Sequence, residues 1–242
     1  MNKIAVVCLI ALTIGTVASA QKEMKPWTEW NAKEAAKILN DSAWGQTQLE
    51  TVQANEQTTA VTNTGSSRNM TPRDASQPPP GSIDSYIKYF IRFLSAKPIR
   101  QAVVRKLQLE NPTMDPQKAE RLNSWVDLSS NEYIVIAVSA EAKDKSLGGG
   151  AAQAFLAANL ESLKDVTYIE RKDGQRVLLS NFKAPGGDGL GAMFVFPRLL
   201  NNQPFINADS GQVRFFSQLG KKIKLEARFK VSDMLYNGKL EY

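Results

Sequence analysis

The stretch TYIERKDGQRVLLSNF, residues 167–182, carries the clearest local signal for the fold. Residues 167–171 and 176–182 are rich in β-branched and aromatic side chains, and Asp173-Gly174 lies between them. Because an Asp-Gly pair readily adopts the backbone conformation of a tight hairpin turn, this stretch predicts two antiparallel strands. The second half of the chain is therefore expected to be mainly antiparallel β-structure.

Further strands are predicted on the C-terminal side of this hairpin, over residues 192–196, 212–217 and 222–231, with Gly220 turning between the last two. In residues 222–231 apolar and charged side chains alternate, which predicts one buried face and one face in water. A second alternation, Tyr236, Gly238, Leu240 and Tyr242, predicts a last strand that closes the sheet.

The preceding part of the chain mixes strands and helices. Residues 86–94 and 133–142 are apolar on both alternating faces, as expected for central strands. Amphipathic helices are predicted from Pro98 to residue 111, over residues 116–126 behind an Asp115 cap, and over about residues 151–164. The expected fold is α+β, a mainly antiparallel sheet or two-sheet sandwich with about three covering helices and a separate N-terminal helix.

That N-terminal helix is predicted over residues 26–45. Asn31 and Glu34 have the spacing of a capping box, and Gly45 is expected to end the helix. Three tryptophans, Trp27, Trp30 and Trp44, are candidate contact anchors, either on the helix's own domain, which is favoured, or on a partner. Residues 46–53 alternate weakly and are a candidate edge strand.

The N-terminus has the pattern of an export signal. Lys3 is followed by an apolar run over residues 4–17, which is too short to span a bilayer, and then by the small residues Ala18-Ser19-Ala20. We expect cleavage near Ala20 and a periplasmic or extracellular location. Because the single cysteine, Cys8, lies in this signal, the exported chain is expected to lack disulfides, which favours a bacterial envelope. No later segment is apolar enough to be a transmembrane helix.

The chain thus divides into four expected segments. Residues 1–20 are the signal peptide, 21–53 the N-terminal helix and edge strand, and 83–242 an α+β domain. Between them, residues 54–82 are rich in Thr, Asn, Ser and Pro, and such a composition predicts a flexible segment.

Composition excludes the commonest catalytic chemistries. The chain has no histidine, and after signal cleavage it would have no cysteine, so the usual general bases, thiol nucleophiles and metal ligands are missing. We therefore assign no catalytic, metal or cofactor site. The net charge of +6 favours anionic neighbours or simple solubility. Since Lys and Arg form no cluster along the chain, nucleic acid is not an expected partner.

Two other features of the sequence bear on possible chemistry. Gly148-Gly149-Gly150 follows a predicted strand and precedes a predicted helix, but it lacks the spacing of phosphate-binding loops and is interpreted as a connector. Four carboxylates lie at predicted strands, where they are typical of a solvent face or a salt bridge. They are Glu132, Glu141, Glu170 and Glu226.

Four short segments give the chain a resemblance to known sequences. They are Pro26-Trp-Thr-Glu-Trp30 with Ile38-Leu-Asn-Asp-Ser-Ala-Trp-Gly45, then Phe194-Val-Phe-Pro-Arg198, and finally Met234-Leu-Tyr-Asn-Gly-Lys-Leu-Glu-Tyr242. By these motifs the chain is similar to uncharacterised secreted bacterial proteins. The resemblance implies export and assigns no activity to any residue.

The favoured function is an exported, non-catalytic envelope or secreted interaction protein, whose expected partner is an envelope protein or an anionic surface. One alternative is a histidine-independent polysaccharide hydrolase or lyase, which needs two nearby carboxyl groups in a cleft, one with a raised pKa. Another is a carrier of lipid or a small apolar ligand, which needs an enclosed apolar cavity.

Overall fold

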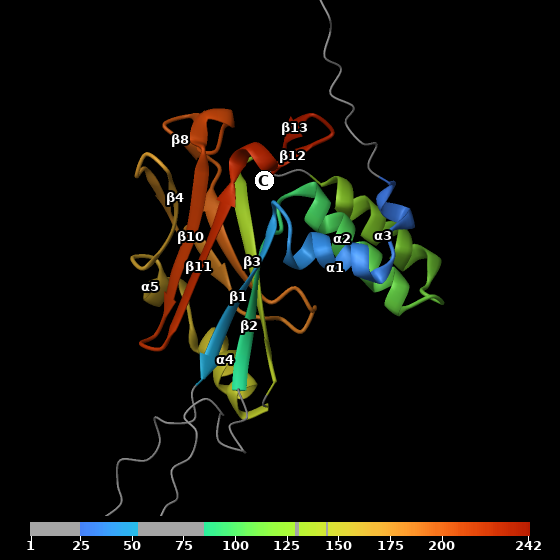
Figure 1. Cartoon of the computed structure of the whole chain (residues 1–242), viewed down its shortest axis with the longest axis horizontal. Coiled ribbons are helices and arrows are strands. Elements are labelled where there is room, and N and C mark those ends of the chain that lie inside the picture. The colour runs from blue at the N-terminus through green and yellow to red at the C-terminus, as the bar shows by residue number, and fades with distance from the viewer. Residues whose placement is uncertain (1–24, 53–84, 129–130, 144) are drawn as a thin grey trace, which may run out of the picture.

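Two antiparallel sheets face each other in the computed structural model, which describes residues 25–52, 85–128, 131–143 and 145–242 (Figure 1). The five-stranded sheet has the order β1 (Gly45–Val52), β2 (Ser85–Phe93), β3 (Tyr133–Ala142), β7 (Ala192–Pro197), β6 (Asn181–Lys183). The four-stranded sheet has the order β11 (Ile223–Lys230), β10 (Gln212–Leu219), β4 (Thr167–Arg171), β5 (Arg176–Leu178). The α+β architecture is as expected. The proposed signal peptide and the segment 54–82 lie outside the described residues.

Aromatic side chains from the inner faces of both sheets form the core. Phe93 of β2 meets Phe229 of β11 edge to face, with ring centroids 4.7 Å apart, and Phe194 of β7 meets Phe215 of β10 at 5.4 Å. All four side chains are fully buried or nearly so. The chain has a single cysteine and can form no internal disulfide, so burial of this apolar surface has to supply most of the stability.

The two sheets are joined at both edges. Leu179 donates its backbone N–H to Thr167 in one sheet, and the next residue, Ser180, donates to Val195 in the other. The strand predicted over residues 176–182 is therefore wrong as a single element, because the chain crosses between sheets at this point to form β5 and then β6. At the opposite edge the Gln48 side chain of β1 donates to the Lys224 carbonyl at 2.7 Å and accepts from the Glu226 N–H at 2.8 Å.

Three helices, α1 (Ala32–Asn40), α2 (Lys97–Glu110) and α3 (Pro116–Asp127), lie together beside the five-stranded sheet (Figure 1). Two arginines tie this layer to the strands. Arg92 donates to the Leu39 carbonyl and to Asn40 at the end of α1, and burial lowers its pKa to about 10. Arg100 of α2 donates to the Leu94 carbonyl just after β2 at 3.3 Å and to the Val126 carbonyl of α3 at 3.1 Å. Arg100 is buried and Arg92 half-buried, and both cations donate to backbone or side-chain oxygens.

The N-terminal helix is capped as predicted but is shorter at both ends, since it begins at Ala32 and not at residue 26. Asn31 and Glu34 form the expected capping box, with N···O distances of 2.9 and 2.7 Å. The helix ends at Asn40, however, and Gly45 is the first residue of β1. Ser42 causes the change, because its hydroxyl donates to the Ile38 carbonyl and accepts from the Gly45 N–H. The candidate edge strand is confirmed as β1.

The helix predicted over residues 151–164 is two helices. The first, α4 (Lys145–Ala157), begins earlier and includes the three glycines that were interpreted as a connector. The second, α5 (Leu160–Leu163), starts afresh because Asn159 caps the Ser162 N–H at 2.9 Å. A capping residue inside an apolar run ends one helix and begins another.

The C-terminal strand predicted to close the sheet is also wrong. Residues 235–240 form a separate hairpin, β12 (Leu235–Tyr236) and β13 (Lys239–Leu240), because Asn237 and Gly238 both take positive φ, 49° and 74°, and turn the chain back. The remaining short elements are β8 (Leu199–Leu200), β9 (Gln203–Pro204) and three 3₁₀ helices, η1 (Trp27–Glu29), η3 (Ala208–Ser210) and η4 (Val231–Asp233).

Candidate functional site

The three tryptophans proposed as contact anchors pack against their own domain. Trp30 and Trp44 are each 6% exposed and belong to the core, and Trp27 is partly buried against it. The Trp44 indole N–H donates to the Glu241 carbonyl at 2.8 Å, which links the N-terminal segment to the C-terminal one. The favoured docking of this helix on its own domain is confirmed, and Trp30 and Trp44 are not available to a partner.

The outer face of the four-stranded sheet gathers charged and aromatic side chains instead. Along β11 the burial alternates residue by residue, so that every second side chain points away from the core. The same holds for β10. We call this surface the charged face, and it consists of Tyr168, Glu170, Arg176, Arg214, Phe216, Lys224, Glu226, Arg228 and Lys230.

A pair of stacked rings forms the middle of the charged face. Tyr168 of β4 and Phe216 of β10 lie opposite each other in the strand register, with ring centroids 5.1 Å apart and planes inclined by 21°. The guanidinium of Arg176 lies 4.2 Å from the Tyr168 centroid, and Lys224 lies 5.6 Å from that of Phe216. Because the face of an aromatic ring attracts a cation, the rings hold these side chains in fixed positions.

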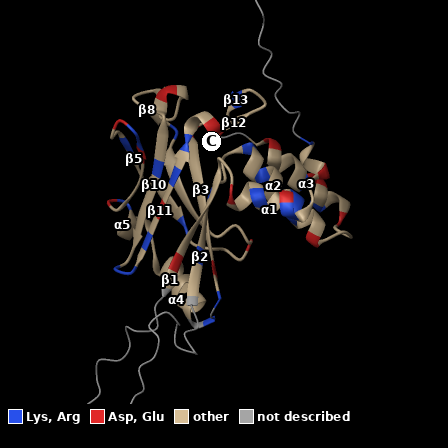
Figure 2. Cartoon of the chain, viewed as in Figure 1, with Lys and Arg blue, Asp and Glu red and all other residues tan. Residues whose placement is uncertain are grey.

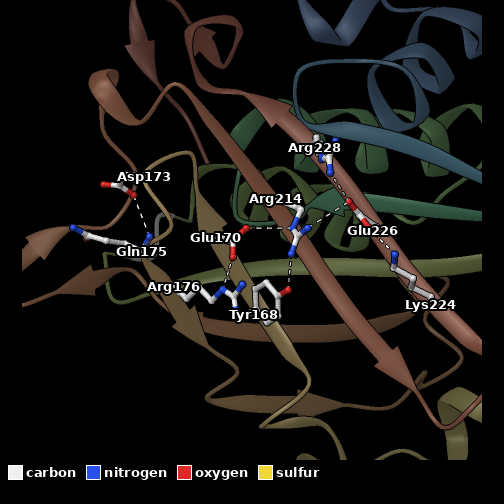
Figure 3. A network of polar contacts seen from close by, with 9 residues as sticks. All are labelled: Tyr168, Glu170, Asp173, Gln175, Arg176, Arg214, Lys224, Glu226 and Arg228. Carbon is white, nitrogen blue, oxygen red and sulfur yellow. Dashed lines mark hydrogen bonds and ion pairs between the residues drawn. The ribbon is translucent and has the colours of Figure 1, made fainter.

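Arg214 lies at the centre of the polar contacts (Figure 3). Its Nη2 donates to the Tyr168 hydroxyl at 2.6 Å. Its guanidinium also lies between two carboxylates, with Nε 3.5 Å from Glu170 Oε1 and Nη1 3.8 Å from Glu226 Oε1. Glu170 in turn pairs with Arg176, which extends the network to β5.

Glu226 is the second node of the network. Lys224 Nζ lies 3.1 Å from one of its carboxylate oxygens, and Arg228 donates to the other at 2.9 Å. The contact with Lys224 is the largest cause of a lowered pKa of Glu226, and Arg214 and Arg228 add to it. Glu226 therefore remains ionised at neutral pH and serves as an acceptor for cations.

Cations outnumber carboxylates on the charged face. Five cationic side chains, those of Arg176, Arg214, Lys224, Arg228 and Lys230, share the face with Glu170 and Glu226, and Lys230 also pairs with Asp233 of η4 at 3.1 Å. Figure 2 shows the basic residues along β10 and β11. The side chains of Arg176, Lys224, Arg228 and Lys230 are between 49% and 68% exposed. The surface thus offers several positive groups to solvent on one face of the sheet.

The four carboxylates noted in the sequence fall into two groups in the structure. Glu170 and Glu226 both contact Arg214 on the charged face, whereas Glu132 and Glu141 are exposed on β3 or next to it. The lowered pKa of Glu226 is opposite to the raised pKa that a general acid needs. Within the described residues, no group of three or more His, Cys, Asp or Glu side chains could hold a metal ion.

The convergence of Tyr168, Arg176, Arg214 and Phe216 was not anticipated from the sequence. The alternation in residues 222–231 predicted the solvent-facing charges of β11, but these four residues come from three other strand segments. The usable signal was the alternation of Arg214 and Phe216 with buried neighbours. That Phe216 lies opposite Tyr168 follows only from the register between β4 and β10.

The chain matches no known protein family, no curated protein and no solved structure. Across the part of the chain that the structure describes, every helix is too short or too polar to cross a bilayer. The geometry of the charged face is therefore the basis for assigning a function.

Proposed function

We propose that this chain is an exported, non-catalytic interaction protein that binds an anionic polysaccharide through the charged face. The single observation that carries the proposal is the set of five cations on one face of the four-stranded sheet, three of them in contact with the stacked Tyr168–Phe216 pair. Fixed cations lose less conformational entropy when they bind an anion than free ones do.

The shape of the face favours an extended ligand. The charged side chains spread across four neighbouring strands, so a polymer lying across the strands would meet several cations in succession. Exposed guanidinium groups pair well with carboxylates, which uronate sugars carry at regular intervals. An excess of positive charge on one face also speeds the encounter with an oppositely charged chain.

The same contacts support a non-catalytic role. Glu170 and Glu226 neutralise Arg214 from both sides, and both remain engaged with other cations. A glycosidase needs one carboxyl group kept protonated, and the cations around Glu226 favour its charged form. On this face the carboxylates therefore position cations.

The proposal predicts that polygalacturonate, a carboxylated polysaccharide, binds the full chain in 50 mM salt. The double variant Arg176→Ala with Arg228→Ala should bind roughly tenfold more weakly, since two exposed ion pairs together contribute up to about 2 kcal/mol. A matched control removes two exposed cations from α1, Lys33→Ala with Lys37→Ala, and should retain the wild-type affinity. Isothermal titration calorimetry measures all three affinities.

Binding of two further ligands, dextran and polyaspartate, distinguishes an anionic polysaccharide from other classes of partner. Neutral dextran should not bind, and raising the salt to 200 mM should weaken polygalacturonate binding because exposed charges are screened. If polyaspartate binds and polygalacturonate does not, the partner is an acidic protein and the polysaccharide proposal is wrong. Equal losses in the two double variants would show that net charge alone, rather than the charged face, drives binding.

A further inference from the structure

A second candidate site lies between the helical layer and the five-stranded sheet, away from the charged face. The loop of residues 184–191, which joins β6 to β7, projects toward the helical layer (Figure 1). A pocket of about 130 Å³ lies where this loop meets α1, α2, β2 and β3. We call it the loop pocket. Its apolar wall consists of Leu39, Leu94, Val103, Leu107, Ala137 and Leu190.

Arg92 of β2 brings a fixed cation to the loop pocket. Its guanidinium donates three hydrogen bonds, one from each nitrogen, to oxygens of α1 and β3. The acceptors are the Leu39 carbonyl at 3.1 Å, Asn40 Oδ1 at 2.8 Å and the Ser139 hydroxyl at 3.1 Å. The guanidinium also lies 5.0 Å from the centroid of the Phe90 ring, whose face attracts a cation. The side chain is therefore held in one position.

Two N–H groups of Arg92 have no acceptor in the part of the chain that the structure describes. A guanidinium has five N–H donors, one on Nε and two on each terminal nitrogen. The three hydrogen bonds use one N–H of each nitrogen, which leaves one N–H on Nη1 and one on Nη2. Because Arg92 is half-buried and lines the loop pocket, a molecule in the pocket would lie against this side chain.

The charge of Arg92 also has no carboxylate partner within 4 Å among the described residues. Two carboxylates line the loop pocket, but each lies beside a lysine instead. Glu110 Oε1 is 3.7 Å from Lys106 Nζ, and Asp188 Oδ2 is 3.9 Å from Lys183 Nζ. Burial alone lowers the pKa of Arg92, with no carboxylate raising it. Since a desolvated cation without an anion is unfavourable, the position beside Arg92 favours an anion.

We infer that the loop pocket binds a short aliphatic carboxylate. The two oxygens of one carboxylate can accept from the two remaining N–H groups of the Arg92 guanidinium, which pairs with carboxylates in this bidentate way. The hydrocarbon tail would leave water and lie against the apolar wall.

The size of the loop pocket limits the ligand. Pockets for drug-sized molecules have volumes of about 300 to 1,000 Å³, and the loop pocket is smaller, so it suits a molecule of a few carbon atoms. A polymer such as polygalacturonate would not fit. The inference therefore does not depend on the function proposed for the charged face.

The test uses sodium butyrate as the probe and the full chain as the protein, at constant ionic strength. In a ¹H–¹⁵N titration the Arg92 Nε–H signal should shift saturably, together with the backbone signals of Val103 and Leu190. Butyrate should bind about tenfold more tightly than acetate, since each buried CH₂ group strengthens binding roughly threefold. Neither 1-butanol nor butylammonium should shift the Arg92 signal, because both lack the carboxylate.

The ion pair beside the pocket provides two variants with opposite expected effects. The side chains of Lys106 and Glu110 are 58% and 56% exposed on α2, so their substitution should leave the fold intact. Lys106→Gln removes a cation and should weaken butyrate binding at least about twofold, whereas Glu110→Gln removes an anion and should strengthen it by a similar factor. Lys118→Gln, at an exposed position of α3 outside the pocket, should bind like the wild type.

Arg92→Lys tests the bidentate pairing. It keeps the positive charge but loses the planar fork, and it should weaken butyrate binding at least about fivefold. Its folding is checked by its melting temperature, and the wild-type titration and the Lys106 and Glu110 variants decide the question even if it unfolds.

Four results would each show that the inference is wrong. They are an unshifted Arg92 signal at high butyrate, a shift of the same size with 1-butanol, binding of acetate or inorganic phosphate as tight as that of butyrate, and a change of affinity in the same direction in Lys106→Gln and Glu110→Gln. None of these results would affect polygalacturonate binding at the charged face.

Discussion

Replacing Phe215 by alanine should lower the free energy of unfolding by about 3–5 kcal/mol, as for other large aromatic side chains in a packed core. Phe215 is fully buried on the inner face of β10. Its ring meets Phe194 at 5.4 Å and Phe196 at 6.2 Å, both from the opposite sheet. Truncation would leave a cavity between the sheets where no disulfide can compensate. Urea unfolding followed by circular dichroism measures the change.

The next residue along the same strand is the matched control. Phe216 points to the charged face, is half-buried, and stacks on Tyr168. Phe216→Ala should cost only about 1 kcal/mol, since it loses one stacking contact and part of its apolar burial. It should also weaken polymer binding, which Phe215→Ala should not do in molecules that remain folded. Equal destabilisation by the two changes would contradict the two-sheet arrangement.

Gly191→Ala is the second substitution with a large expected effect. Gly191 has φ of +88°, and a Cβ atom there would lie 2.2 Å from the Val138 carbonyl oxygen and 2.7 Å from its carbon. Neither atom can move without shifting β3, because Val138 pairs with Ala192 at the start of β7. We expect a loss of about 3–5 kcal/mol, the sum of backbone strain and a displaced strand.

Gly189→Ala separates these two causes. Gly189 has a similar φ of +78°, but its Cβ would meet nothing within 4 Å. The substitution should therefore cost only the backbone strain, about 1–2 kcal/mol. Thermal unfolding of both variants gives the comparison. A Gly191→Ala protein as stable as Gly189→Ala would show that β3 and β7 do not approach each other as the structure has them.

Local signals predicted much of the fold. The Asp173-Gly174 hairpin, the alternation in residues 222–231 and the Asn31–Glu34 capping box all correspond to observed elements. Where the expectations were wrong, a short polar side chain had redirected the backbone. Ser42 ended the first helix, Asn159 divided the third, and Asn237 turned the last strand into a hairpin. Such side chains act over three or four residues, whereas periodicity is averaged over longer windows.

The sequence predicted only part of the charged face. The alternation of apolar and charged residues within one strand indicated that Lys224, Glu226 and Arg228 face water. This pattern can be recognised without knowing which strands are neighbours. The stacking of Tyr168 on Phe216, 48 positions apart by the numbering, depends on which strands pair and in what register. The crossing of the chain between sheets at Leu179 also depends on strand pairing, because hydrogen bonds to two different strands determine it.

The proposal that the charged face binds a polyanion is tested most directly at its arginines. A ¹H–¹⁵N spectrum of the guanidinium Nε–H groups can be recorded while polygalacturonate is added. The account predicts shifts for Arg176, Arg214 and Arg228, and none for Arg92 and Arg105, which donate to backbone carbonyls in the helical layer. Unchanged charged-face signals at saturation, or shifts confined to the helical layer, would contradict it.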